Sequence, residues 1–239
     1  MPPSGGLSHI GGTMEEKLIE MLQLQDKLNK KINENWKEIR TKEDFARATW
    51  IECAELVDSL PWKWWKKQEA DIENVQIEVV DIWHFVLSYL MLEHKTLEEI
   101  IASKSVQNFK KGINEDFTNI EVDGAYINHY LGETDKYKKI IFLAERVAES
   151  FLKQNLDEGM FFFGLLVRNS ISFDSMYFLY VGKNILNHIR QEKGYRSGGY
   201  KKEINGMEDN RYLFNIVKSI KTREELEEKI RKEFEKIHS

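Results

Sequence analysis

Residues 75–92 read V-Q-I-E-V-V-D-I-W-H-F-V-L-S-Y-L-M-L and contain neither proline nor glycine. A helix with this sequence is apolar nearly all round, which is typical of a central helix buried on most sides. The pattern therefore predicts a helix over about 73–94. Its two acids, Glu78 and Asp81, must then lie in the core of the protein.

Other apolar stripes with helical spacing lie on both sides of this segment. They predict helices over about 14–33, 41–60, 136–154, 157–171 and 174–193, and a charged helix that begins at Thr222. The chain of 239 residues has only 3 prolines and 14 thinly spread glycines, which leaves little turn chemistry for a β-sandwich or barrel. We therefore expect an all-α protein with a helical bundle core.

Two parts of the chain depart from this helical pattern. Residues 1–13 are rich in Gly, Ser and Pro and lack the basic start and apolar core of a signal peptide, so we expect a tag-like or disordered leader. Residues 112–135 are irregular, acidic and punctuated by glycine. The predicted organisation is a single all-α domain over 14–239, with an inserted helical segment at about 96–135 that is a candidate for movement.

The overall charge and cysteine content narrow the range of functions. A net charge of −5 and a pI near 5.8 argue against a sequence-independent grip on nucleic acid, which needs a clustered basic footprint. Cys53 has no second cysteine to pair with, and no stretch reaches the roughly 20 apolar residues of a membrane helix. We expect a cytoplasmic protein without nucleic-acid or membrane partners.

Two pairs of acids carry the strongest chemical signal. Glu52 and Glu55 lie three residues apart in W-I-E-C-A-E-L, and Glu78 and Asp81 have the same spacing in I-E-V-V-D-I-W. This spacing puts each pair on one helix face. Four buried carboxylates repel one another and lose their hydration, so a divalent cation is needed to compensate them. Ligands that offer only oxygen favour Mg²⁺ over zinc or a di-iron centre.

A second group of polar residues lies near the end of the predicted helix 174–193. Lys183, Asn187 and Arg190 follow one another at helical spacing, and Tyr195 and Lys202 come after them across a glycine-rich loop. Arginine chelates phosphate oxygens with two donors, and lysine adds a point charge. This group is therefore a candidate phosphate clamp, although a solvated helix face would show the same pattern.

Further candidates for substrate contact are amides and rings. Gln25 and Asn29 point where the helical periodicity predicts leucines, and their amides offer the donors and acceptors that a uracil edge requires. Trp62 and Trp65 could flank a base, and His84 follows Asp81 by three residues and could line the same pocket. Each also has a plain structural alternative, as an amide bonded to a neighbouring helix, a packing aromatic or a core histidine.

In these residues the chain resembles the dimeric dUTPases, members of the all-α nucleoside triphosphate pyrophosphatase superfamily. The carboxylate pairs alone would indicate only the superfamily. Three further features narrow the resemblance to the dUTPases: the amides Gln25 and Asn29 in the first predicted helix, the tryptophans at 62–65, and the block at 182–195 that contains Lys183, Asn187, Arg190 and Tyr195. The matching blocks are L-Q-D-K-L-N at 24–29, E-C-A-E-L-V-D-S at 52–59, P-W-K-W-W-K at 61–66, I-E-V-V-D-I-W-H-F at 77–85, G-K-N-I-L-N-H-I-R-Q-E-K-G-Y at 182–195 and Y-K-K at 200–202.

The resemblance implies a role for each of these residues. The four acids would bind two or more Mg²⁺ ions, with Glu52 also activating the water. Gln25 and Asn29 would read uracil, and Asn187 would contact the nucleotide. The phosphates would be held by Lys183, Arg190, Tyr195 and Lys202.

The resemblance also implies an activity and an assembly. Water would attack the β-phosphate of dUTP to give dUMP and pyrophosphate, which limits uracil incorporation into DNA and supplies dUMP. dUDP would also be hydrolysed, and the chain would form a homodimer. Two alternatives stay open: a sister pyrophosphatase acting on dCTP or a modified nucleotide, and a non-enzymatic helical interaction module whose acids form salt bridges.

Overall fold

The computed structural model describes residues 11–114, 121–122, 125–126, 135–204 and 206–238. The chain divides into two compact units. Unit 1 consists of Met1–Ile39 and Asp174–Ser239, and unit 2 consists of Arg40–Phe173.

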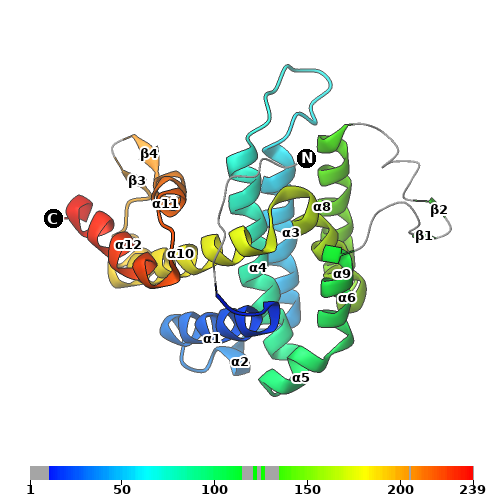
Figure 1. Ribbon diagram of the computed structural model, residues 1–239, viewed down its shortest axis with the longest axis horizontal. Helices are drawn as coiled ribbons and strands as arrows, with labels where there is room; N and C mark the ends of the chain where they lie inside the picture. Colours follow the sequence, from blue (N-terminus) through cyan, green and yellow to red (C-terminus); the bar gives the residue numbers. More distant parts are fainter. Residues whose placement is uncertain (1–10, 115–120, 123–124, 127–134, 205, 239) are drawn as a thin grey trace. The chain divides into compact units, whose positions relative to one another are not determined.

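Unit 2 is built from helices and one short antiparallel hairpin (Figure 1). Its elements are α3 (Lys42–Asp58), α4 (Ile72–Glu93), α5 (Leu97–Ala102), α6 (Lys104–Asn114), β1 (Glu121–Val122), β2 (Ala125–Tyr126), α8 (Lys136–Leu152) and α9 (Leu156–Ser170). Helix α3 packs against α4 and α8, and α9 packs against α4, α6 and α8. The predicted all-α bundle is confirmed.

Helix α4 is the buried centre of unit 2, as its apolar sequence predicts. Trp83 is fully buried and stacks on Phe109 of α6 and Phe163 of α9, with ring centroids 5.0 and 5.3 Å apart. By length and composition α4 could cross a membrane, but 78% of its apolar stretch is buried inside the protein. Its apolar surface is therefore covered by the other helices of the bundle.

Helices α6 and α9 approach so closely that only glycine fits at their crossing. A methyl group on Gly112 would collide with the carbonyl oxygen of Phe161, and one on Gly164 would collide with that of Phe109. The first part of the predicted insertion at 96–135 thus packs into the core through α6. Residues 115–120, 123–124 and 127–134 of that insertion lie outside the described residues.

Unit 1 combines the two ends of the chain. Its elements are α1 (Met14–Ile32), α2 (Trp36–Ile39), α10 (Phe173–Glu192), whose first residue belongs to unit 2, a 3₁₀ turn (Tyr195–Ser197), β3 (Glu203–Ile204), β4 (Met207–Glu208), α11 (Asp209–Lys218) and α12 (Arg223–His238). The hydroxyl of Tyr180 on α10 lies 3.0 Å from the carbonyl oxygen of Met21 on α1. Gly182 lets α10 approach Val217 of α11 and Ile230 of α12.

The ends of several helices agree with the sequence signals. Helix α10 is followed by Gly194 at φ 80°, the left-handed conformation that glycine commonly adopts after a helix. Thr13 caps α1 through a hydrogen bond from the Glu16 amide, so this residue of the predicted leader belongs to the folded part. Residues 1–10 of that leader lie outside the described residues. Helix α11 and both hairpins were not predicted.

Candidate functional site

The two adjacent helices α3 and α4 bring three of the four predicted metal ligands together. One carboxylate oxygen from each of Glu52, Glu55 and Glu78 lies within 4.8 Å of the other two. Glu78 is buried, Glu52 is half-buried and Glu55 is exposed. The group therefore runs from the core of unit 2 to its surface. Asp81 lies outside this closest group, although its charge acts on Glu78.

Glu78 occupies an environment that is unfavourable for an isolated carboxylate. Asn74 donates a 3.0 Å hydrogen bond from Nδ2 to Oε1 of Glu78. Among the residues that the structure describes, no hydrogen-bond donor meets the buried Oε2. Burial, followed by the charges of Asp81 and Glu52, raises the pKa of Glu78 to about 9. The nearby Glu52 and Glu55 carboxyls add to this shift, because like charges favour the protonated form of Glu78.

This donor set fits a hard divalent cation. It consists of carboxylate oxygens alone, as Mg²⁺ prefers, and the lone cysteine on α3, Cys53, lines a different surface of the helix. A cation at this position would offset the repulsion among the acids and would give Glu78 Oε2 a partner. The residues present therefore match the predicted metal site.

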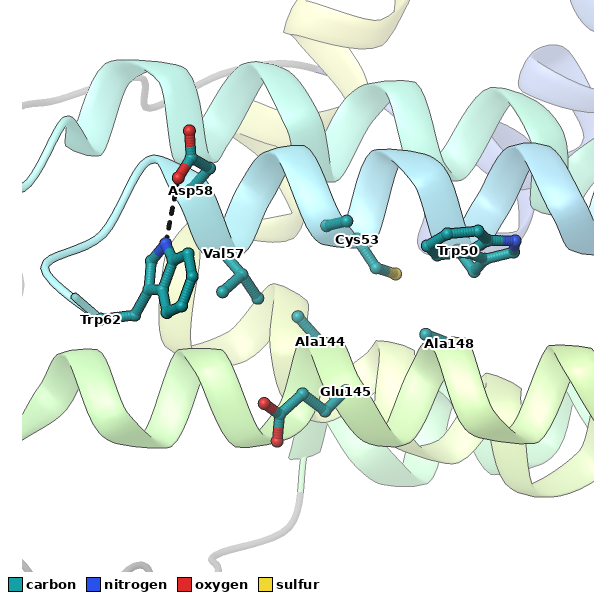
Figure 2. A pocket seen from close by; sticks show the side chains of 9 residues that line it. Trp50, Cys53, Val57, Asp58, Trp62, Ala144, Glu145 and Ala148 are labelled. Carbon is teal, nitrogen blue, oxygen red and sulfur yellow. Dashed lines mark hydrogen bonds between the residues drawn. The ribbon is translucent and has the colours of Figure 1, made fainter.

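Trp62 lies at a different place in unit 2. It lines an apolar pocket of about 370 Å³ between α3 and α8, together with Trp50, Cys53, Ala54, Val57, Asp58, Ala144, Glu145 and Ala148 (Figure 2). Its indole N–H donates a 3.0 Å hydrogen bond to Asp58. The carboxylate group lies between α3 and α4, whereas the pocket lies between α3 and α8. The structure thus does not bring Trp62 into the carboxylate group.

His84 is buried within α4. Its Nδ1 lies 2.8 Å from the carbonyl oxygen of Val80, one turn earlier, which is a hydrogen bond when Nδ1 carries the proton. This contact fixes the ring against its own helix. It matches the structural alternative of a core histidine.

The predicted base-reading amides lie in unit 1 and are held rigidly. Gln25 and Asn29 are both buried, and Gln25 Nε2 donates a 3.0 Å hydrogen bond to Asn29 Oδ1. The Tyr180 hydroxyl lies 3.0 Å from Gln25 Oε1 and can donate its one proton either there or to the carbonyl oxygen of Met21, at the same distance. Burial raises the pKa of the Tyr180 hydroxyl well above its ordinary value. When Tyr180 donates to Gln25, these bonds set which end of each amide points in which direction.

The predicted phosphate group also lies in unit 1, around the second half of α10. Arg190 donates to both carboxylate oxygens of Asp209 and from Nη1 to Asn187 Oδ1. Lys183 donates to Asn210 Oδ1, which also accepts from Arg190. The structure thus joins Lys183, Asn187 and Arg190 into one network.

Tyr195 and Lys202 border this network. The guanidinium of Arg190 lies 5.7 Å and the ammonium of Lys202 lies 5.6 Å from the centroid of the Tyr195 ring. At these distances both cations interact with the ring. All five predicted members of the phosphate group therefore belong to one cluster of unit 1.

Four residues of these networks were not predicted from the sequence: Tyr180, Asp209, Asn210, and Tyr200, whose hydroxyl donates to Asp209. Tyr180 has the helical spacing of an ordinary core residue, so nothing in the sequence marks its hydroxyl. Asp209 and Asn210 follow the unpredicted hairpin β3–β4, which brings them back to α10. The tripeptide E-D-N at 208–210 is a polar signal at a helix start, but by itself it does not indicate a partner.

Comparison with known proteins identifies the family. No curated protein matches the chain. The family model described as dUTPase matches residues 17–195, well over half of the chain. Members of this family hydrolyse dUTP and generally use a divalent metal. This favours the enzyme over the interaction-module alternative, and the chain belongs to the dUTPase family, with dUTP diphosphatase as its activity.

Proposed function

We propose that the chain is a Mg²⁺-dependent pyrophosphohydrolase that converts dUTP to dUMP and pyrophosphate at a site with two or more metal ions. Glu52, Glu55, Glu78 and Asp81 would hold the ions. The observation that carries this proposal is the buried carboxylate of Glu78, which sits among other acids with one oxygen that meets no donor in the described part of the chain.

The substrate would be bound by the two networks of unit 1. Gln25 and Asn29 would read the uracil edge through amides whose directions are set by Tyr180. Lys183, Arg190, Tyr195 and Lys202 would hold the phosphates, and Asn187 would contact the nucleotide. Trp62 and His84 remain proposed substrate contacts, although neither geometry adds support: Trp62 lines the α3–α8 pocket and His84 bonds its own helix.

The reaction would be an attack of water on the β-phosphorus. Glu52 would take a proton from the water while the water oxygen bonds to the β-phosphorus. The bond between the β-phosphorus and the oxygen that bridges it to the α-phosphorus would break, and dUMP would leave with that oxygen. Bound Mg²⁺ would lower the pKa of the water and neutralise charge on the transferring group. Lys183 and Arg190 would stabilise the charge on the phosphates that they bind.

Two further properties belong to this proposal. Because dUDP carries the same β-phosphate linkage, the chain would also hydrolyse dUDP, to dUMP and phosphate. The chain would act as a homodimer in the cytoplasm, where the buried thiol of Cys53 stays reduced. A sedimentation measurement of the full chain tests the dimer directly.

The experiment for the proposed reaction is hydrolysis in water enriched in ¹⁸O, with dUTP, dUDP and dCTP as substrates and with Mg²⁺ or a chelator. We expect chelator-sensitive turnover of dUTP and dUDP, with the label in pyrophosphate or phosphate. Label in dUMP would contradict attack at the β-phosphorus. A preference for dCTP would contradict the assignment of the uracil-reading amides.

A further inference from the structure

A buried ion pair joins the predicted phosphate group to a residue that sequence reasoning did not include. Arg190 donates from Nε to Asp209 Oδ2 at 2.9 Å and from Nη2 to Asp209 Oδ1 at 2.6 Å. The Arg190 side chain is 8% exposed and that of Asp209 is 0% exposed. Two parallel bonds to a planar guanidinium fix both its position and its plane.

The chain beyond α10 is folded so as to hold this carboxylate in place. The hairpin β3–β4 turns at Gly206, which has a φ of 78°. The backbone N–H of Asp209 then donates a 2.7 Å hydrogen bond to the carbonyl oxygen of Lys202. The hydroxyl of Tyr200 donates to Asp209 Oδ2 at 3.0 Å. Hydrogen bonds to its backbone and to its side chain therefore hold Asp209 in place independently of Arg190.

The same pair determines how the remaining polar groups are arranged. Arg190 Nη1 donates to Asn187 Oδ1 at 3.0 Å, and Nη2 donates to Asn210 Oδ1 at 2.9 Å. Lys183 donates to the same oxygen of Asn210. A guanidinium held at its Nε–Nη2 edge thus fixes the amides of Asn187 and Asn210, and through Asn210 the ammonium of Lys183.

We propose that Asp209 is a positioning residue for nucleotide phosphates: it holds Arg190 by the Nε–Nη2 edge so that Arg190 and Lys183 are presented together to the phosphates beyond the first. This inference rests on the proposed function, because it takes Arg190 as a phosphate-binding residue. Asp209 and Asn210 lie beyond residues 17–195, the part that the family model matches. The inference therefore extends the candidate site into the hairpin and α11.

The test compares two ligands that differ in their phosphates. The dissociation constants of a non-hydrolysable dUTP analogue and of dUMP are measured calorimetrically with the full chain and Mg²⁺. The dissociation constant of dUMP divided by that of the analogue reports the contribution of the outer phosphates, and a loss of overall stability alone would not change this ratio. For Asp209→Asn we expect the ratio to fall about tenfold, as for one lost charge-assisted contact. Asn215→Ala, an exposed position on α11, is the control and should leave the ratio unchanged.

Arg190→Lys separates this inference from the function on which it rests. If Arg190→Lys lowers the ratio and Asp209→Asn lowers it no further in the double variant, Asp209 acts through Arg190. If only Arg190→Lys lowers the ratio, the positioning role is wrong and the phosphate role of Arg190 stands. If Arg190→Lys has no effect, the phosphate role of Arg190 is wrong and this inference falls with it.

Two other results also decide the matter. Tighter analogue binding in Asp209→Asn would mean that Asp209 competes with phosphate for Arg190, which overturns the positioning role.

If Asp209→Asn does not fold, Tyr200→Phe takes its place, because it removes one hydrogen bond from Asp209 and keeps the ion pair. We then expect a two- to threefold fall in the ratio, about half of the effect of a full contact. An unchanged ratio in folded Tyr200→Phe overturns the inference.

Discussion

Asn74 donates a 3.0 Å hydrogen bond to Glu78 one turn further along α4, and so holds that carboxylate in place before any cation binds. A buried acid held among other acids has two ways to relieve the repulsion. It can take up a proton, or it can bind a cation. The raised pKa of Glu78 reflects proton uptake, and the proposed metal site would provide the cation.

The proton-bound state of Glu78 predicts how the stability of the metal-free protein depends on pH. The pKa of this group is about 9 in the folded chain, against an ordinary value of 4.5, so between these values the folded state holds a proton that the unfolded state has lost. The contribution of Glu78 to the free energy of unfolding should therefore fall as the pH rises from about 4.5 to about 9.

This pH dependence is measured by urea unfolding in the presence of a chelator. In Glu78→Gln the amide cannot titrate, so the slope over this pH range should be shallower than in the unsubstituted chain. Equal slopes in the two proteins would show that Glu78 does not carry the effect.

Glu78→Gln should also abolish turnover of dUTP. The amide replaces a charged ligand by a neutral one, while burial and the contact with Asn74 keep the fold intact. Pyrophosphate release is the measurement, with circular dichroism as the check on folding. Glu93→Gln is the matched control on the same helix, because Glu93 is exposed and its ion pair with Lys42 contributes little. Turnover that survives in Glu78→Gln would remove this residue from the metal site.

Tyr180→Phe should reduce discrimination between bases. Without the hydroxyl, the carbonyl end of the Gln25 amide loses its donor, and the direction of the amide pair is no longer fixed. We expect the ratio of kcat/KM for dUTP over dCTP to fall about tenfold, which corresponds to one hydrogen bond. Tyr177→Phe on the same helix is the control, because its hydroxyl bonds Glu20 instead. Equal losses in both variants would point to a general effect on α10.

Gly164→Ala should destabilise unit 2 without touching the carboxylates. The added methyl group meets the carbonyl oxygen of Phe109 across the α6–α9 crossing, so the two helices must separate. We expect a loss of about 1–3 kcal/mol in the free energy of unfolding, as for overpacked cores. Urea unfolding measures it, with Gly11→Ala, where no atom lies within 4 Å of the new methyl group, as the control. An unchanged stability would contradict the close crossing.

The parts of the site that the sequence predicts depend on spacing within one helix. Glu52 and Glu55 meet Glu78 because a three-residue spacing in an apolar helix leaves the acids one face to occupy. The pairing of Arg190 with Asp209 depends instead on the hairpin β3–β4, which closes a contact between residues 19 positions apart. No local periodicity carries that information.

The fold shows the same limit. The long apolar helices were predicted to within a few residues, because burial imposes a period on their sequences. Helix α6 was predicted only as part of an insertion, since Phe109 and Gly112 are too few to reveal a core helix before α9 is in place. The division of the chain into two units was not predicted either, because unit 1 is assembled from both ends of the sequence.

The most direct test of the account is a calorimetric titration of Mg²⁺ into the full chain and into Glu78→Gln, each saturated with a non-hydrolysable dUTP analogue. We predict that, near neutral pH, Mg²⁺ binds to the unsubstituted chain with release of protons. Glu78→Gln should bind Mg²⁺ at least about tenfold more weakly. Equal Mg²⁺ affinity in the two proteins would contradict the claim that the carboxylates of α3 and α4 form the metal site.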